Sequence, residues 1–269
     1  MYKGSKSAII KYFRSLKKKK HRKDEGKFII EGPHLVEEAL KEGLLDKAIY
    51  SRNFASTLEA KELLKRISDK NIVCVEESAQ NISSISSVET PQGIIASAKP
   101  NSSDLGSLFE KSDPLIVIAY EIQDPGNLGT IIRTCDAAGC SGLILSKGTV
   151  DPYNDKVIRA SSGSIFRLNI IKADDIIELI SSLKRRGIKV LSAASNAEQS
   201  IFNADLSGPT ALIIGNEGKG VPGEIEKLSS GTLSIPMEGG TESLNAAVSA
   251  AVILYEALRQ RRYLERSKG

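Results

Sequence analysis

Short apolar segments of strand length recur along the chain, and stretches with the apolar spacing of helices separate them. In the first hundred residues the predicted strands are 27–31, 47–51, 71–75 and 93–98. Helical patterns lie between them, at 33–42 and 57–69. This alternation predicts a small α/β domain over residues 1–98.

The stretch KPNSSDLGSLFEKSDP then interrupts the pattern. It is rich in Ser, Pro, Asn and charge, which is typical of a linker. We therefore predict a linker at 99–113 and a second domain at 114–269.

The alternation becomes regular in this second part. Apolar runs fall at 114–120, 141–145, 189–193, 211–215 and 231–235, with helical patterns at 128–138, 173–186 and 222–228. The strands are continuously apolar and helices follow them, which predicts a mostly parallel sheet covered on both faces. In such sheets ligands bind beyond the carboxyl ends of the strands.

The composition is that of a folded protein of a reducing compartment. Hydrophobic residues make up 41% of the chain, enough for a real core. No apolar run reaches the ~18–20 residues of a membrane span, and the basic N-terminus lacks the apolar part of a secretion signal. The cysteines, Cys74, Cys135 and Cys140, form no CxxC pair, which argues against a disulfide framework or a zinc site. We expect a cytoplasmic protein without a metal and without a membrane partner.

The positive charge is concentrated at one end of the chain. Residues 1–27 hold eleven Lys or Arg and two acidic residues, a net charge of +9, whereas the rest of the chain has a net charge of −5. A run such as KKKKHRK favours a polyanionic partner, since each phosphate contact releases counterions. A solvated tail is the alternative that this feature alone leaves open.

Polar residues gather at two junctions that follow predicted strands. In YEIQDPGNLGTIIRTCDAAG, Asn127 can cap the next helix, and Arg133 lies six residues further on. An Asn amide and an Arg guanidinium near the start of one helix suit a ribose and a phosphate. In LIIGNEGKGVP, glycines flank Asn216 and Glu217, but the spacing is neither that of a P-loop nor GxGxxG. When each junction is taken alone, an ordinary capped helix remains the alternative for the first, and a purely structural glycine loop remains the alternative for the second.

A third junction, SIPMEGGTESLNAAVSAAVILY, leads from a strand through a glycine-rich loop into a long helix full of alanine. Ser243 and Asn245 stand at the start of this helix, where free backbone N–H groups collect. Polar side chains at a helix N-terminus, beside small residues that allow close packing, favour a ligand site. A capped helix buried in an α/β core remains the alternative.

Together and in this order, NLGTIIRTCDAAG, LIIGNEGKGV and SIPMEGGTESLNAAVSAAVILYE resemble the three motifs of the SpoU (TrmH-type) family of RNA ribose 2′-O-methyltransferases. The segment DPYNDKVIRASSGSIFRLNI resembles the RASxGSxF segment of that family, so the resemblance covers about residues 114–260. The stretch HRKDEGKFIIEGPHLVEEAL resembles the family's substrate-binding domain, which is similar to ribosomal protein L30e.

The resemblance implies features that periodicity does not predict. It implies a SPOUT-type α/β fold whose C-terminal loops, at 215–220 and 235–245, form a deep trefoil knot and hold S-adenosylmethionine. It also implies a homodimer in which each active site is completed by the partner. The L30e-like domain, with its basic N-terminal arm, is implied to bind the RNA substrate.

The resemblance also assigns residues by motif position. The implied catalytic residues are Asn127, Arg133, Glu217, Ser243 and Asn245. Those implied to surround the cofactor are Ile214, Gly215, Asn216, Glu217, Gly218, Ile235, Met237, Ser243 and Leu244. Those expected to contact RNA are Lys17, Lys18, Lys19, Lys20, Arg22, Lys23 and Arg159. The family proposal makes the arginine a general base, but a guanidinium normally stays protonated, and stabilisation of a developing alkoxide needs no neutral arginine.

The predicted function is therefore methyl transfer from S-adenosylmethionine to a ribose 2′-hydroxyl, with 23S ribosomal RNA favoured over transfer RNA. Two other classes stay open: an RNA-binding protein without catalysis, and a knotted methyltransferase that acts on a base. The presence of the full polar constellation argues against the first, and the SLN sequence at 243–245 argues against the second. The missing GxGxxG makes a nicotinamide oxidoreductase a poor fit.

Overall fold

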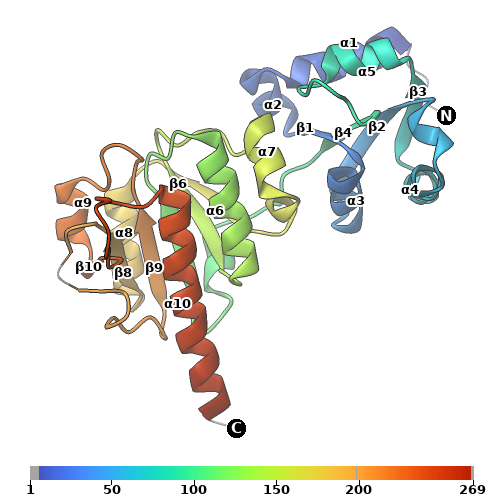
Figure 1. Cartoon of the computed structure of the whole chain (residues 1–269). Coiled ribbons are helices and arrows are strands. Elements are labelled where there is room, and N and C mark those ends of the chain that lie inside the picture. Colours follow the sequence, from blue (N-terminus) through green and yellow to red (C-terminus); the bar gives the residue numbers. More distant parts are fainter. Residues whose placement is uncertain (1–5, 198, 268–269) are drawn as a thin grey trace. The chain divides into compact units, whose positions relative to one another are not determined.

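The computed structural model describes residues 6–197 and 199–267, and these form two compact units (Figure 1). The first unit takes in the chain up to Asn101 together with Tyr153–Arg167. The second takes in Ser102–Pro152 and the chain from Leu168 onward. Each unit has its own sheet.

The first unit is built on a four-stranded mixed sheet in the order β1-β4-β2-β3. Its strands are β1 (Phe28–Glu31), β2 (Leu45–Ser51), β3 (Val73–Glu77) and β4 (Ile94–Ala98). Its helices are α1 (Lys6–Leu16), α2 (Lys19–Glu25), α3 (Pro33–Lys41), α4 (Leu58–Asp69), α5 (Ala79–Ile85) and α7 (Asp155–Ser161), with 3-10 turns η1 (Phe54–Ser56) and η3 (Ser164–Phe166). Strand β4 runs antiparallel to β1 and β2, whereas β2 and β3 are parallel. Helices α1 and α5 cover one face of this sheet, and α3 and α4 lie on the other (Figure 1).

The described part of the basic N-terminal segment forms helices, and α1 packs into the core of the first unit. Its side chains Ile9, Ile10, Phe13 and Leu16 recur at helical spacing and are buried, three of them against β2, β4 and α5. The Tyr12 hydroxyl donates a hydrogen bond to the carboxylate of Asp46 at 3.2 Å. The sequence pattern had assigned no element before residue 27, so α1 and α2 are additions to the prediction, and α5 is a third.

Residues Tyr153–Arg167 pack on the first unit through aromatic contacts. The Phe28 ring stacks on Tyr153 with centroids 4.6 Å apart, and Phe166 lies beyond it at 6.0 Å. Gly163 has a φ of 90°, and a Cβ there would stand 2.9 Å from Cγ of Glu38. The domain ranges predicted from the sequence place this segment in the C-terminal domain, whereas its contacts in the structure lie with the first unit.

The second unit contains a six-stranded sheet in the order β10-β8-β9-β5-β6-β7, and every pairing in it is parallel. Its strands are β5 (Leu115–Ala119), β6 (Gly142–Ser146), β7 (Ile170–Ala173), β8 (Lys189–Ala193), β9 (Thr210–Ile214) and β10 (Gly231–Leu233). Its helices are α6 (Pro125–Ala137), α8 (Ile176–Arg185), α9 (Gly223–Leu228) and α10 (Ala246–Ser267), with one 3-10 turn, η2 (Gly106–Phe109). The predicted parallel sheet is confirmed, and β7 is a strand that the pattern missed.

Helices cover both faces of the parallel sheet. Helices α8 and α9 pack their apolar side chains on one face, while α6 and α10 pack against each other over the other face (Figure 1). Strands β5, β6 and β9 are buried along their whole length, which explains their continuous apolar sequences. Small residues allow α6 and α10 to approach closely: Ala247, Ala250 and Ala257 on α10 and Gly129 on α6 are all buried. The trefoil knot stays a prediction from the resemblance. None of the helices in the described ranges is long and apolar enough to cross a membrane.

The packing of α1 predicts a large effect of truncating Phe13. Replacing Phe13 with Ala should lower the free energy of unfolding by about 3–5 kcal/mol, because the side chain is fully buried and its loss leaves a cavity. Urea denaturation of the full chain, followed by circular dichroism, measures this. The matched control is Lys11→Ala in the same helix, where the side chain is exposed. Equal unfolding free energies for the two variants would show that α1 does not pack on the sheet.

Candidate active site

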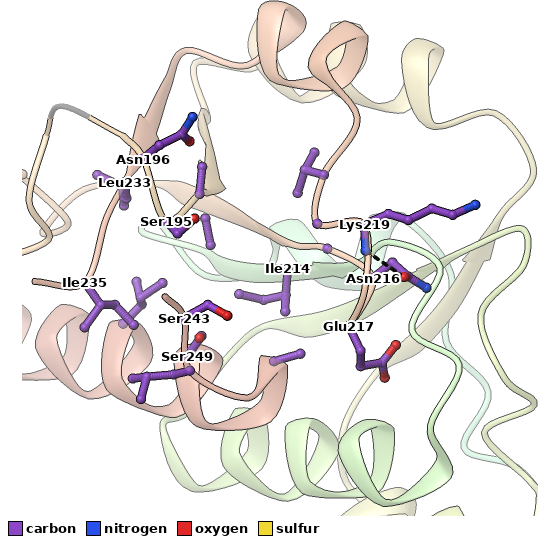
Figure 2. Close-up of a pocket in the computed structure, with 18 of the residues that line it drawn as sticks. Ser195, Asn196, Ile214, Asn216, Glu217, Lys219, Leu233, Ile235, Ser243 and Ser249 are labelled. Atoms are coloured by element: carbon purple, nitrogen blue, oxygen red, sulfur yellow. Dashed lines mark hydrogen bonds between the residues drawn. The ribbon is translucent and has the colours of Figure 1, made fainter. Parts of the chain in front are cut away.

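A pocket of about 430 Å³ lies beyond the carboxyl ends of β8 and β9 and next to the segment that follows β10 (Figure 2). Because these strands are parallel neighbours, their carboxyl ends meet at one edge of the sheet. The nine residues that the resemblance assigns to the cofactor all line this pocket: Ile214, Gly215, Asn216, Glu217, Gly218, Ile235, Met237, Ser243 and Leu244. The structure thus brings them together from two loops that lie about twenty residues apart in the sequence.

The loop after β9 depends on glycine at position 215. A Cβ on Gly215 would stand 2.3 Å from the carbonyl carbon of Gly220, so any larger residue would force the loop open. The backbones of Asn216 and Gly220 exchange two hydrogen bonds, at 3.1 and 2.9 Å. The turn therefore folds tightly back on itself.

The Asn216 side chain is used to shape its own loop. Its Oδ1 accepts hydrogen bonds from the backbone N–H groups of Gly218 and Lys219, at 3.0 and 3.1 Å. Its Nδ2 donates to the carbonyl of Glu121 at 2.8 Å. Although Asn216 was expected to contact the cofactor from the rim, its amide positions the backbone that lines the pocket.

The backbone at Glu121, directly after β5, has a φ of 51°, which a residue with a side chain rarely adopts. Two hydrogen bonds hold it there: its N–H donates to Ser146 Oγ at 2.8 Å, and its carbonyl accepts from Asn216. Strained backbone that is fixed by its surroundings is common at functional sites. Here it ties the ends of β5 and β6 to the glycine loop.

The N-terminus of α6 is capped by Asp124, which corrects the prediction that Asn127 is the cap. The helix begins at Pro125, and Asp124 Oδ1 accepts the N–H of Asn127 at 2.8 Å. The side chain of Asn127 is therefore available for other contacts. The pattern alone missed this because Asp and Asn are equally good caps.

Asn127 joins Glu217 to Asn245 in a chain of side-chain hydrogen bonds. Its Nδ2 donates to Glu217 Oε1 at 2.9 Å, and its Oδ1 accepts from Asn245 Nδ2 at 2.8 Å. Asn245 Oδ1 in turn accepts the N–H of Ala247 at 2.9 Å, which makes it the cap of α10. Since a backbone N–H can only donate, the orientation of each amide in the chain is fixed. This chain, the Asn245–Asn127–Glu217 relay, connects the three predicted motifs.

The Glu217 carboxylate is surrounded by donors. Besides Asn127, the backbone N–H groups of Gln123 and Asp124 donate to it at 3.2 and 3.1 Å. Burial raises the pKa of Glu217, but the hydrogen bonds from Asn127 and the backbone outweigh this, and the net pKa is lower than its usual value. Glu217 therefore stays ionised at neutral pH. As a hydrogen-bond acceptor it holds the N-terminus of α6 against the glycine loop.

The remaining predicted catalytic residues, Arg133 and Ser243, lie apart from the relay. Ser243 is on the pocket wall, and Figure 2 shows it with Ser249 on the α10 side, across from Ser195 and Asn196. Arg133 is exposed on α6, about 120° around the helix from Asn127, and does not line the pocket. Among the described residues none forms a hydrogen bond or ion pair with its guanidinium.

The sequence analysis missed one wall of the pocket. Ala193 at the end of β8 lines this wall, with Ala194, Ser195 and Asn196 directly after it. Ser249 and Ile253 from α10 also line the pocket. The signal was present, because the apolar run at 189–193 is a buried parallel strand whose carboxyl end belongs to the same edge. Lys219 also lines the pocket, on the side of the glycine loop (Figure 2).

The residues expected to contact RNA lie in the first unit. Lys17 and Lys18 lie in the α1–α2 turn, and Lys19, Lys20, Arg22 and Lys23 are in α2. All six except Arg22 are exposed, and Arg22 Nη1 donates to the carbonyls of Leu16 and Lys17, at 3.2 and 2.9 Å. Arg159 is on α7. Arg22 therefore fixes the end of α1, and Lys17 Nζ donates to the Ser86 carbonyl at 3.2 Å, whereas Lys18, Lys19, Lys20 and Lys23 present exposed charge.

Comparison with known proteins identifies the fold and motifs. The family model described as the SpoU rRNA Methylase family matches residues 114–255, which is more than half of the chain. The chain belongs to the SpoU rRNA methylase family. The MRM3-like substrate binding domain matches residues 7–96 of this SpoU protein. Both confirm the resemblance seen in the sequence.

Relatives match the chain over nearly its whole length. The 23S rRNA (guanosine(2553)-2′-O)-methyltransferase RlmP of Bacillus subtilis is 34% identical over 94% of this chain and 96% of its own. The SpoU methyltransferase AviRb from Streptomyces viridochromogenes, solved in complex with AdoMet, has a TM-score of 0.84 at 29% identity, over 95% of this chain and 98% of its own. An AdoMet-bound rRNA methyltransferase from Sinorhizobium meliloti has a TM-score of 0.83 at 30% identity, over 98% and 97%.

The relay predicts that Glu217 supports cofactor binding through loop geometry. In Glu217→Gln, an amide would face the N–H donors that now bind a carboxylate, so the affinity for S-adenosylmethionine should fall by about tenfold. Isothermal titration calorimetry measures this, with Glu224→Gln on the exposed surface of α9 as the control. Unchanged affinity in Glu217→Gln would contradict the role of the relay.

The same variant predicts a pH dependence of stability. Because the pKa of Glu217 is lowered in the folded state, its stabilisation is complete above the unfolded carboxyl pKa of about 4.3. This stabilisation is lost as the pH falls through the pKa of Glu217 in the folded state. The difference in stability between the wild type and Glu217→Gln should therefore be constant near neutral pH and shrink in the acid range.

Proposed function

We propose that this protein transfers a methyl group from S-adenosylmethionine to a ribose 2′-hydroxyl of 23S ribosomal RNA. The observation that carries the proposal is the pocket at the sheet edge, where the nine residues assigned to the cofactor meet beside the Asn245–Asn127–Glu217 relay. Membership of the SpoU family supports S-adenosylmethionine-dependent ribose methylation of ribosomal RNA. The named relative RlmP, aligned over both units, supports the 23S target.

The residues of the pocket fit S-adenosylmethionine. The volume of about 430 Å³ lies within the ~300–1,000 Å³ range of small-molecule sites. Ile214, Leu233, Ile235 and Leu244 offer apolar walls for a neutral base. The tight backbone around Gly215 supplies N–H and C=O groups at the same wall. When bound, the cofactor supplies an activated methyl group.

Glu217 is a positioning residue in this scheme. A carboxylate that accepts several N–H groups and has a lowered pKa is a weak base. Its contribution is to hold Asn127, and through it Asn245, at the mouth of the pocket. Proton release from the 2′-hydroxyl then depends on groups outside the relay, and Arg133 stabilises the developing alkoxide as a protonated guanidinium.

A homodimer explains why Arg133 lies outside the pocket of its own chain. Helix α10 carries a stripe formed by Val248, Val252 and Tyr255, and Val248 and Tyr255 are 46% and 53% exposed. Apolar side chains at i, i+4 and i+7 on a surface helix are typical of an interface. We place the partner subunit on this stripe, with Arg133 reaching the partner's pocket.

We also place the protein in the cytoplasm. The cysteines Cys74, Cys135 and Cys140 are free thiols, which fits a reducing compartment. Ribosomal RNA as the substrate fits the same location.

The direct test is transfer of radiolabelled methyl from S-adenosylmethionine to ribosomal and transfer RNA fractions assayed separately. Nuclease digestion of the product should locate the label on a ribose 2′-oxygen of 23S RNA. Label in transfer RNA alone would show that the substrate is transfer RNA. Label on a base would show that the enzyme methylates a base instead of a ribose. Absence of label on naked RNA and on ribosomal assembly intermediates alike would overturn the enzyme assignment.

Replacing Arg133 with Ala should abolish turnover and leave the affinity for S-adenosylmethionine unchanged, because the side chain is not on the pocket wall. Mixing this variant with Gly215→Ala, whose added Cβ clashes with the Gly220 backbone and disrupts the cofactor loop, should restore up to about a quarter of the activity in mixed dimers. Near-normal methylation by Arg133→Ala would contradict its catalytic role. No recovery in the mixture would contradict the shared active site.

A further inference from the structure

We infer that the first unit holds a pocket for a single unpaired nucleotide of the RNA substrate. This inference rests on the proposed function, and it adds a site of its own within the substrate-binding unit. The pocket has a volume of about 240 Å³. It lies between the end of α1, strand β1, the end of α5 and helix α7, all within the first unit.

The interior of this pocket, here called the base pocket, is apolar. Its walls come from side chains that belong to the unit's core: Leu16, Ile29, Ile30, Leu35, Ile85 and Ile158. Tyr153 adds an aromatic wall, and its ring is held in place by stacking on the buried Phe28. Unpaired RNA bases are bound by stacking on such rigid aromatic and apolar surfaces.

The rim of the base pocket is positively charged. Lys17, Arg22 and Arg159 line it, and the exposed Lys18, Lys19, Lys20 and Lys23 follow along the same segment. An apolar pocket beneath a cluster of basic side chains matches a nucleotide, whose base is flat and neutral and whose phosphate is charged. An apolar peptide segment would gain nothing from this charge.

Two acidic residues also lie on the lining. Glu31 accepts hydrogen bonds from Ser86 Oγ at 2.5 Å and from the Ser87 backbone N–H at 3.2 Å, which fix its carboxylate but leave its charge. Asp155 pairs with Arg159 Nη1 at 3.1 Å. The three basic residues of the lining outnumber the two acidic ones, and the exposed lysines beside them add further positive charge.

Arg159 is oriented at the mouth of the pocket. Its Nη1 donates to Ser87 Oγ at 2.7 Å and to Asp155, so one corner of the guanidinium is fixed. No other described residue forms a hydrogen bond with its Nε and Nη2 groups. A guanidinium held in this way keeps a pair of N–H groups for a phosphate. Lys17, whose Nζ donates to the Ser86 carbonyl at 3.2 Å, stands beside the same loop.

The test compares single-stranded and fully paired RNA of the same length, because only the single strand can place a base in the pocket. Ser87 is exposed at the mouth, so Ser87→Leu should partly fill the opening without unfolding the chain. Thr90→Leu, in the same exposed loop but outside the lining, is the matched control. For charge, Arg159→Ala is matched by Lys156→Ala on the exposed side of α7.

Fluorescence anisotropy with the full-length protein and labelled decamers gives the dissociation constants. Ser87→Leu should weaken binding of the single strand about tenfold more than binding of the duplex, the order expected for loss of one stacked base. Any smaller loss shared by the two forms reflects the hydrogen bond that Arg159 donates to Ser87 Oγ. Arg159→Ala should weaken both forms, more than Lys156→Ala does. Equal losses for single strand and duplex in Ser87→Leu, or no loss in either, would overturn the base pocket.

Two further measurements separate this inference from the proposed function. The affinity for S-adenosylmethionine should be the same in all four variants, because the cofactor pocket lies in the second unit. Circular dichroism should show that all four keep the wild-type fold of the first unit. If the wild type methylates RNA, and Ser87→Leu has the same methylation activity and the same RNA affinity, the base pocket is refuted and the enzyme assignment stands. A wild type that binds single-stranded RNA through the pocket but methylates no RNA would refute the enzyme assignment and leave the pocket intact.

Discussion

The Glu217 carboxylate is the group on which the geometry of the active site depends. It accepts hydrogen bonds from Asn127 and from the two backbone N–H groups that precede α6, and Asn127 passes the constraint on to Asn245 at the start of α10. Three segments far apart in the sequence are thereby fixed at one edge of the parallel sheet. The tight turn at Gly215 and the strained backbone at Glu121 support the same edge from the side of β9 and β5. Because both carboxylate oxygens accept N–H groups and the pKa of Glu217 is lowered, Glu217 gives the site rigidity, and the proton chemistry depends on other groups.

The two units divide the work between cofactor and substrate in this account. The second unit gathers a glycine-shaped pocket whose lining combines apolar side chains with polar ones, which suits a small cofactor. The first unit carries the basic segment at Lys17–Lys23, and the described part of that segment continues a helix buried in its core. A charged surface anchored by Phe13 and its neighbours can present phosphate contacts at fixed positions, which a loose tail cannot. Phosphate contacts by themselves do not discriminate between RNA sequences. The base pocket beneath this surface would add recognition of an unpaired nucleotide.

The sequence predicted the parallel sheet well, because buried parallel strands are continuously apolar. The residues that the resemblance assigns to the cofactor lie together around one pocket, at the carboxyl ends of those strands. It did not predict α1, whose apolar positions are diluted by charged residues, or α2, which has no apolar residue at all. It also missed β7, whose four residues are too few to give a pattern. The cap of α6 was assigned to Asn127 instead of Asp124, because both residue types cap equally well and only the helix start decides. The packing of Tyr153–Arg167 on the first unit follows from ring contacts with Phe28, which no local pattern reveals. The exposed position of Arg133 likewise depends on helix phase and on what covers α6.

The most direct test of the central claim is amide hydrogen exchange of the full-length protein with and without S-adenosylmethionine. The account predicts that the cofactor slows exchange in the loop after β8, in residues 214–221 and in residues 235–246, and leaves Lys17–Lys23 unchanged. Protection confined to the first unit, or none at these three segments under saturating cofactor, would contradict the assignment of this sheet edge as the cofactor site.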